Sequence, residues 1–140
     1  MISLKHEDVI YWAVKLYQSD TVLLLSEFSP IHENIFGEHV TLAFRPSLDI
    51  HNKMLQHLGE RIALGVIKYV FDYKAQAIVV NGINRTDGGT PHITISCRSD
   101  TRPIYSNTMI NSSASNVDIS KNLILNGVVA AYTKNGWVIG

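Results

Sequence analysis

Hydrophobic and polar positions near the N-terminus predict one helix followed by one strand. Apolar residues at helical spacing indicate a helix over residues 6–19, and Glu7 and Asp8 in its first turn suit the helix dipole. The apolar and β-branched run over residues 21–28 is typical of a buried strand. Turn-forming residues then predict a loop over residues 29–38.

The rest of the chain is mostly strand-like, because it is rich in Val, Ile, Tyr and Phe or alternates with a period of two. The dipeptide Asn135-Gly136 is a strong hairpin signal and joins the last long strand to a short one. Many strands beside one well-marked helix make α+β the expected fold class. We expect strands over 39–45, 61–72, 75–82, 92–98, 123–132 and 137–139, a short helix over 48–58, and loops over 84–90 and 111–118.

Composition places the chain among ordinary globular proteins. Its 140 residues are 46% hydrophobic and 17% charged, so we expect a single domain over residues 1–140 with one core. Twelve basic residues balance twelve acidic ones, so the formal net charge is zero. No overall field attracts nucleic acid or an anionic membrane, and a phosphate ligand must be held by local groups.

The remaining compositional features exclude several classes of protein. A single cysteine, Cys97, rules out an internal disulfide framework and a cysteine-rich zinc site, and we expect no metal and no cofactor. Apolar runs such as residues 22–25 are too short to cross a bilayer, and residues 1–8 lack the pattern of a signal peptide. We therefore expect a cytoplasmic protein without a membrane partner. The sequence leaves the oligomeric state open.

A seven-residue motif that occurs twice carries the candidate chemistry. HVTLAFR occupies residues 39–45 and HITISCR residues 92–98, so the two copies start 53 positions apart. Both read His, β-branched, Thr, aliphatic, small, apolar, Arg. A single His-x-Thr is uninformative, whereas two copies in matching strand contexts are much rarer by accident. The alternative is a coincidence of strand composition, with Thr present for its β propensity.

Strand geometry sorts each copy of the motif into two faces, because successive side chains point to opposite sides. The apolar faces are predicted to carry Val40, Leu42 and Phe44 in the first copy and Ile93, Ile95 and Cys97 in the second. The other faces are predicted to carry His39, Thr41, Ala43 and Arg45, and His92, Thr94, Ser96 and Arg98. Each strand then presents an imidazole and a hydroxyl side by side.

Two such strands facing each other supply the groups that phosphodiester cleavage needs. One histidine takes a proton from the attacking oxygen, and the other gives a proton to the leaving oxygen. An imidazole with an ordinary pKa of ~6.5 suits both tasks near neutral pH. The hydroxyls of Thr41 and Thr94 can donate hydrogen bonds to the non-bridging oxygens, where charge grows in the transition state. This chemistry requires no metal.

At these residues the chain resembles the 2H phosphoesterase superfamily, which has two His-x-Thr/Ser-x tetrapeptides, matched here by residues 39–42 and 92–95. The likeness runs from about residue 21 to about residue 110. Further segments resemble the cyclic phosphodiesterase branch seen in fungal tRNA ligases and in small bacterial and phage relatives, namely residues 38–44, 90–95 and 102–107.

The resemblance implies a fold, a pair of catalytic residues and a range of substrates. The fold would be a two-lobed, pseudo-symmetric 2H phosphoesterase (LigT-like) fold, α+β in class, with antiparallel sheets around a central groove. His39 and His92 would be the general acid and base, in an order that stays open, and Thr41 and Thr94 would hold the phosphate. Substrates of the family include 2′,3′-cyclic phosphates at RNA ends, 2′,5′-linked oligonucleotides and cyclic dinucleotide or trinucleotide signals.

Five further residues are candidates for substrate binding. Arg45 and Arg98 share the motif face and could bind a phosphate, although arginines at strand ends are often simply solvated. Tyr105, Ser106 and Asn107 could line the rim of a pocket, with Tyr105 stacking on a base, or could form a turn.

The predicted function is that of a metal-independent phosphodiesterase with a two-histidine mechanism. Its substrate is expected to be a nucleotide or an RNA end that carries a 2′,3′-cyclic phosphate. One alternative is a phage-type hydrolase of the cyclic oligonucleotides that act as immune second messengers, and the zero net charge favours such a small ligand over long RNA. A second alternative is a module that binds nucleotides or RNA ends without turnover.

Overall fold

A computed structural model of the chain describes residues 4–112 and 114–140. It contains one large sheet, three α-helices and a short 3-10 turn. In chain order the elements are η1 (His6–Asp8), β1 (Val9–Leu16), α1 (Gln18–Glu27), β2 (Asn34–Ile35), β3 (His39–Phe44), α2 (Leu48–Leu55), β4 (Arg61–Phe71), β5 (Ala75–Asn81), β6 (His92–Cys97), α3 (Tyr105–Ile110), β7 (Ser115–Asp118), β8 (Ile124–Thr133) and β9 (Gly136–Val138).

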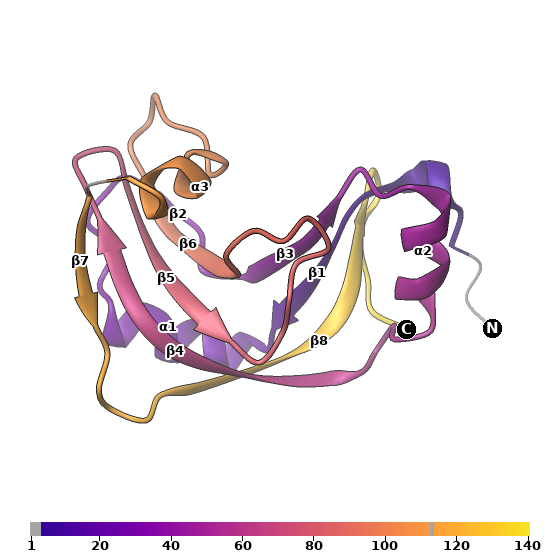
Figure 1. Cartoon of the computed structure of the whole chain (residues 1–140), viewed down its shortest axis with the longest axis horizontal. Helices are drawn as coiled ribbons and strands as arrows, with labels where there is room; N and C mark the ends of the chain where they lie inside the picture. The colour runs from indigo at the N-terminus through magenta and orange to yellow at the C-terminus, as the bar shows by residue number, and fades with distance from the viewer. Residues whose placement is uncertain (1–3, 113) are drawn as a thin grey trace.

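All strand pairs in the sheet are antiparallel, and the main path runs β2-β6-β5-β4-β8-β1-β3, with β7 beside β4 and β9 beside β8 (Figure 1). The sheet curls, so that β3 at one end of this path comes within 8 Å of β6 near the other end, measured between Cα atoms. The expected α+β class, with a large antiparallel sheet, is confirmed.

The helix predicted over residues 6–19 is wrong, because most of this segment is strand β1. The strand lies between β3 and β8 and pairs with both. Trp12, Val14 and Leu16 are buried on one side of it, at every second position. These apolar residues satisfy a two-residue period as well as a helical one, and pairing with two neighbouring strands decides between the two.

The strand predicted over residues 21–28 is also wrong, because helix α1 occupies it. Leu24 is the one buried residue of this helix, whereas Val22 is exposed. An apolar run of this length has no periodicity that separates a buried strand from a surface helix. Asp20 lies in the first turn, and its side-chain oxygen accepts a 3.1 Å hydrogen bond from the backbone N–H of Asn126 in β8.

The other predicted elements are close to the observed ones. The strands expected from residue 39 onward coincide with β3, β4, β5, β6, β8 and β9, and the expected short helix is α2. Ser47 caps α2, since its hydroxyl accepts a 3.3 Å hydrogen bond from the N–H of Ile50. Two predicted loops contain short strands, with β2 within residues 29–38 and β7 within residues 111–118.

An extra residue interrupts β3 directly after the threonine of the first motif. Ala13 of β1 pairs with Thr41, but Trp12, the next residue, pairs with Ala43, so Leu42 is unmatched. An extra residue on one strand is a β-bulge, and it reverses the alternation of faces beyond it. The bulge turns both Leu42 and Ala43 toward the buried side of the sheet, where they join apolar clusters.

The second motif contains a bulge at the corresponding position. Ala77 of β5 pairs with Thr94, whereas Gln76 pairs with Ser96, so Ile95 is unmatched. Both bulges lie at the fourth residue of the motif. His and Thr therefore keep their common face in each copy, and the residues that follow are rotated away from it.

The bulges correct part of the predicted division into faces. Ala43 does not share the face of His39, and Ser96 does not share the face of His92. Instead, the Ser96 hydroxyl donates a 2.6 Å hydrogen bond to Oε1 of the buried Gln76. Cys97 is buried, as expected, but it belongs to the cluster that packs beneath α3.

Three apolar clusters hold the helices on the sheet. The largest gathers residues from β1, β3, β4, β5, β6 and β8 together with Leu24 of α1. A second packs Ile50 and Met54 of α2 around Trp12, whose indole N–H donates to Nδ1 of the buried His51 at 3.3 Å. A third contains Met109 of α3. No helix within the described residues is long and apolar enough to span a membrane.

Candidate active site

The two motif histidines come from strands that are distant in the sheet but adjacent in space. His39 begins β3 and His92 begins β6, and the starting ends of the two strands meet near the middle of Figure 1. Burial lowers the pKa of His39, and a positive charge on His92 lowers it further. The fold therefore brings the two motif strands close together.

Aromatic rings surround His39. The ring of Tyr11 stacks on the imidazole with centroids 5.0 Å apart and planes 25° apart, and Trp137 contacts it edge-on at 5.6 Å. Lys15 is paired with His39 across β1 and β3. Burial, the charge of His92 and the charge of Lys15 together lower the pKa of His39 to about 4. This imidazole is therefore neutral at pH 7 in the free protein.

His92 is held in one orientation by its own chain. Its Nδ1 lies 2.9 Å from the carbonyl oxygen of Thr90. Since a carbonyl only accepts hydrogen bonds, Nδ1 carries the hydrogen, and Nε2 is the basic nitrogen of the neutral ring. Burial lowers the pKa of His92, and the nearby positive charge of Arg85 lowers it further, while Asp87 and the hydrogen bond to Thr90 act in the opposite direction.

Thr94 is tied to helix α3. Its Oγ1 lies 2.8 Å from Oγ of Ser106, which is fully buried, and 3.5 Å from the carbonyl oxygen of Pro103. When the Ser106 hydroxyl donates, Thr94 directs its own hydrogen to the carbonyl oxygen of Pro103 at 3.5 Å, a long bond that an incoming oxygen can replace. Thr41 occupies the corresponding place in the first motif, half-buried beside Ala13 of β1.

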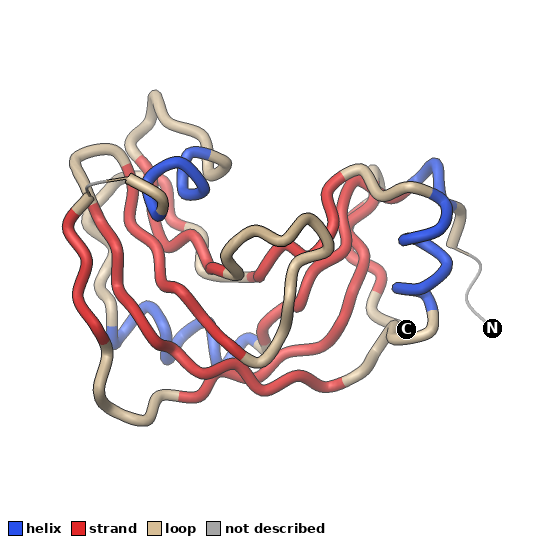
Figure 2. Tube along the Cα trace, viewed as in Figure 1, coloured by secondary structure: helices blue, strands red, loops and turns tan. Residues whose placement is uncertain are grey.

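The loop between β5 and β6, residues 82–91, joins the two motifs. Both the N–H and the hydroxyl of Thr86 donate to the carbonyl oxygen of Leu42, at 2.9 and 3.1 Å. The loop thus crosses from β5 to the first motif before it returns to the second, as Figure 2 shows. The bonds from Thr86 hold the loop against the first motif, and the end of the loop leads directly into β6 and the second motif.

Arg85, on this loop, is held by three hydrogen bonds. Its Nε and Nη2 donate to the two carboxylate oxygens of Asp87 at 3.0 and 2.7 Å, and its Nη1 donates to Oδ1 of Asn107 at 3.0 Å. Only 10% of the Arg85 side chain is exposed. A guanidinium has five N–H donors, so two remain for another acceptor. Asp87 stays ionised, since the hydrogen bonds from Arg85 lower its pKa to about 2.

Each candidate arginine follows the end of its motif strand that lies opposite the histidine. Arg45 follows the bulged strand in the left-handed region, with φ of 46°, and its guanidinium lies 5.4 Å from the ring of Phe44. Arg98 forms an ion pair of 3.1 Å with Asp100 and lies over the ring of Tyr73 at 5.6 Å.

The three candidates around residue 106 are brought to the second motif by α3. Ser106 contacts Thr94 directly, and Asn107 contacts Arg85. The hydroxyl of Tyr105 donates to Oδ2 of Asp72 at 2.5 Å, and this bond raises the pKa of Tyr105 to about 12.

Sequence analysis missed three residues at the site. Tyr11 lies in the segment predicted to be a helix. Because this segment is strand β1, the Tyr11 side chain shares one side of the strand with Ala13 and Lys15. Trp137 belongs to the hairpin that the dipeptide 135–136 predicts, but no motif marks its side chain. Arg85 lies in a flexible-looking loop, and no pattern indicated its burial. No group of three His, Cys, Asp or Glu side chains within the described residues is arranged to hold a metal ion.

Comparison with known proteins gives a fold but no family. No protein-family model matches the chain, and no curated protein matches its sequence. Among solved structures, the chain is similar to the crystal structure of a fungal RNA kinase, with a TM-score of 0.55 and 14% identity. The similarity covers 90% of this chain but 46% of the kinase chain, so this chain spans less than half of that protein.

Proposed function

We propose that the protein is a phosphodiesterase that acts on a nucleotide or an RNA end, most simply on a 2′,3′-cyclic phosphate, as the resemblance to 2H phosphoesterases implies. The observation that carries the proposal is the approach of β3 and β6 to within 8 Å between Cα atoms. Each strand begins with a histidine, half-buried His39 and buried His92, followed on the same strand face by a threonine. The fold is similar to that of a fungal RNA kinase, which is compatible with an enzyme that processes RNA ends.

The two histidines differ in ways that divide the proton transfers between them. His92 has its tautomer set by the Thr90 carbonyl, so Nε2 is available to take a proton from the attacking water. His39 has a pKa of about 4 and is neutral in the free protein, so it gains its proton as the anionic substrate binds; once protonated, it is the stronger donor for the leaving oxygen. Water then adds to phosphorus, the bond to one ribose oxygen breaks, and a phosphate monoester forms.

Three groups are proposed to hold the anionic phosphate. The hydroxyls of Thr41 and Thr94 donate to the non-bridging oxygens, as the family resemblance implies. Arg85 adds a charged donor, because two of its N–H groups are not used by Asp87 or Asn107. An anion bound here also raises the pKa of the nearby histidines, so that one of them becomes protonated in the complex.

A panel of substrates tests the proposal. The protein is incubated in EDTA with 2′,3′-cyclic mononucleotides, RNA oligonucleotides ending in a 2′,3′-cyclic phosphate, 2′,5′-linked oligonucleotides and cyclic dinucleotides, and the products are resolved by chromatography. We expect the cyclic phosphates to be opened to monoesters without a metal. Turnover of only the cyclic dinucleotides would instead identify a hydrolase of second messengers. Tight binding without any product would identify a binding module.

The low pKa values of both histidines predict an acidic pH optimum for kcat/KM, which reports on the free enzyme. The reaction needs one protonated and one neutral imidazole. With the pKa of His39 near 4 and that of His92 below its ordinary value of 6.5, kcat/KM should peak between pH 4 and 6.5 and fall about tenfold per unit above that range.

The charge of Lys15 offers a control for the cause of this profile. Because Lys15 lowers the pKa of His39, Lys15→Met should move one limb of the bell toward higher pH. Stopped assays on a cyclic mononucleotide from pH 3.5 to 9 measure both profiles. A wild-type rate that stays level from pH 5 to pH 9 contradicts the two-histidine assignment.

A further inference from the structure

A cavity lies at the turn between β4 and β5 and borders α3, the helix that contacts the second motif. Its volume is about 480 Å³, and its walls come from this turn, from the loop after β6 and from α3. The lining residues are Lys74, Asp100, Thr101, Arg102, Ile104, Tyr105 and Thr108. Neither motif histidine contributes to it, so it is a separate place on the molecule.

Positive charge predominates in this cavity. Lys74 and Arg102 form no ion pair with any residue among 4–112 and 114–140. The carboxylate of Asp100 is already paired with Arg98 at 3.1 Å. Asp72, at the start of the turn, accepts hydrogen bonds from the Tyr105 hydroxyl and from backbone N–H groups of the turn. Two cations are therefore left without an anionic partner.

Aromatic rings accompany these cations. The ammonium group of Lys74 lies 5.6 Å from the ring centre of Tyr73 and 5.1 Å from that of Tyr105. Tyr73 is 68% exposed, and the guanidinium group of Arg98 also lies 5.6 Å from its ring centre. Cations interleaved with an exposed aromatic ring are the arrangement that proteins use for single-stranded nucleic acids, where phosphates meet the cations and bases stack on the rings.

The cavity is connected to the candidate active site through two consecutive residues of α3. Tyr105 lines the cavity, and the next residue, Ser106, contacts the hydroxyl of Thr94. The carbonyl oxygen of Pro103, in the same segment, also lies 3.5 Å from that hydroxyl. A strand that places its reactive phosphate at Thr94 therefore has a short path along α3 into the cavity.

We propose that this cavity binds the polynucleotide strand that leads to the reactive end. A backbone phosphate lies between Lys74 and Arg102, and a base stacks on Tyr73. The proposed function is needed only to say what happens at the other end of the strand, since binding in the cavity does not depend on turnover. The substrate class that follows is a single-stranded oligonucleotide rather than a lone cyclic nucleotide.

Binding of a non-reactive oligonucleotide tests the inference. The probe is a fluorescein-labelled uridine decamer with a 3′-hydroxyl, which has no cyclic phosphate to open. The double variant Lys74→Ala/Arg102→Ala should raise its Kd by about tenfold or more. Two lost phosphate contacts should also reduce the slope of log Kd against log salt by about 1.4, at about 0.7 for each contact with a single strand. Tyr73→Ala should raise Kd by fivefold or more without changing this slope.

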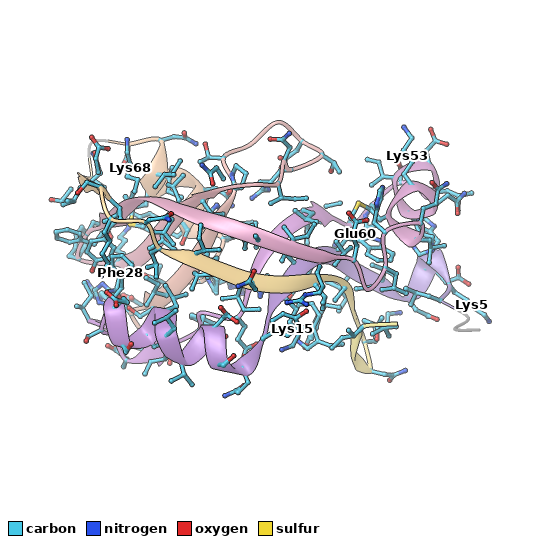
Figure 3. The ribbon with its side chains drawn as sticks, turned by 90° about the horizontal axis from the view of Figure 1, so that it is seen from below. Lys5, Lys15, Phe28, Lys53, Glu60 and Lys68 are labelled. Carbon is cyan, nitrogen blue, oxygen red and sulfur yellow. The ribbon has the colours of Figure 1, made fainter. Side chains whose placement is uncertain are left out.

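The matched control removes the same charge elsewhere. Lys5 and Lys53 are exposed residues at the opposite end of the molecule from Lys68 and Phe28, as Figure 3 shows. Lys5→Ala/Lys53→Ala should leave Kd and the salt slope unchanged. Equal weakening by this control pair, or equal binding of a labelled glutamate decamer to the cavity, would overturn the inference, because attraction would then reflect overall charge or an acidic peptide.

Kinetics separate this inference from the proposed function. In the cavity double variant, KM for an RNA ending in a 2′,3′-cyclic phosphate should rise about tenfold, while kcat/KM for a cyclic mononucleotide stays unchanged. A protein that binds the decamer through the cavity but cleaves nothing keeps the inference and refutes the phosphodiesterase. A protein that opens cyclic mononucleotides but binds the decamer no better than a mononucleotide keeps the phosphodiesterase proposal and refutes the cavity inference.

Discussion

Replacing either His39 or His92 with alanine is expected to lower kcat/KM for a 2′,3′-cyclic phosphate by about 10²–10⁴-fold, because each change removes one of the two proton transfers. The bell-shaped pH profile should also lose one limb in each variant. Steady-state assays on purified protein, with products separated from substrate, measure both effects.

The choice of leaving group distinguishes the two histidines. A p-nitrophenolate leaves without a proton, so a general acid contributes little to the cleavage of a p-nitrophenyl phosphodiester. If His39 is the acid, His39→Ala should be nearly as active as the wild type on such a substrate, whereas His92→Ala should remain strongly impaired. The opposite pattern would exchange the two roles.

His57→Ala is a suitable control for the loss of an imidazole. This histidine is exposed, and its ring bonds to Glu60 at 2.7 Å, far from the motifs in sequence. Its replacement should leave the rate unchanged. Full activity in either motif variant, with a pH profile like that of the wild type, would end the two-histidine proposal.

The second large effect is expected at Thr94. If its hydroxyl donates to a non-bridging oxygen, Thr94→Ala should lower kcat by about 10²–10³-fold, as the loss of an oxyanion donor does elsewhere. Thr94→Ser keeps the donor and should retain most of the activity. Because the donor matters more in the transition state than in the ground state, KM should change little.

Ser106 provides a test of how Thr94 is oriented. Its buried hydroxyl lies 2.8 Å from that of Thr94, so Ser106→Ala should cause a smaller loss of kcat than Thr94→Ala, without affecting the pH profile. Ser115, an exposed serine of β7, is the matched control, and Ser115→Ala should have no effect on kcat. A Thr94→Ala variant with wild-type kcat would remove this residue from the mechanism.

The candidate histidines could be identified from the sequence because the signal lies within each strand. A repeated His-x-Thr on an alternating background needs no knowledge of neighbouring strands to show which side chains share a face. Beyond the bulges, the sequence alone no longer shows which side chains share a face. The predicted positions of Ala43 and Ser96 failed because an unmatched residue appears only when a strand is seen against its partner.

The prediction of a helix followed by a strand at the N-terminus was wrong for a related reason, since the structure has a strand followed by a helix. The segment VIYWAVKL, residues 9–16, fits both periods, and β3 and β8 select the strand by pairing with both of its edges. Because β1 was not predicted, Tyr11, which stacks on His39, was not predicted to be part of the site. The same holds for Arg85, whose burial depends on Asp87 and on Asn107 of α3.

By itself, the sequence determined which chemical groups this protein has, the strand character of most of its segments, and the repeat that singles out two histidines and two threonines. Tertiary structure alone decided that β3 and β6 meet, that aromatic rings and Lys15 surround His39, and that the Thr90 carbonyl and Arg85 act on His92. The reason is physical: a side chain's identity is local, whereas its pKa and its partners depend on burial and charge supplied by distant parts of the chain.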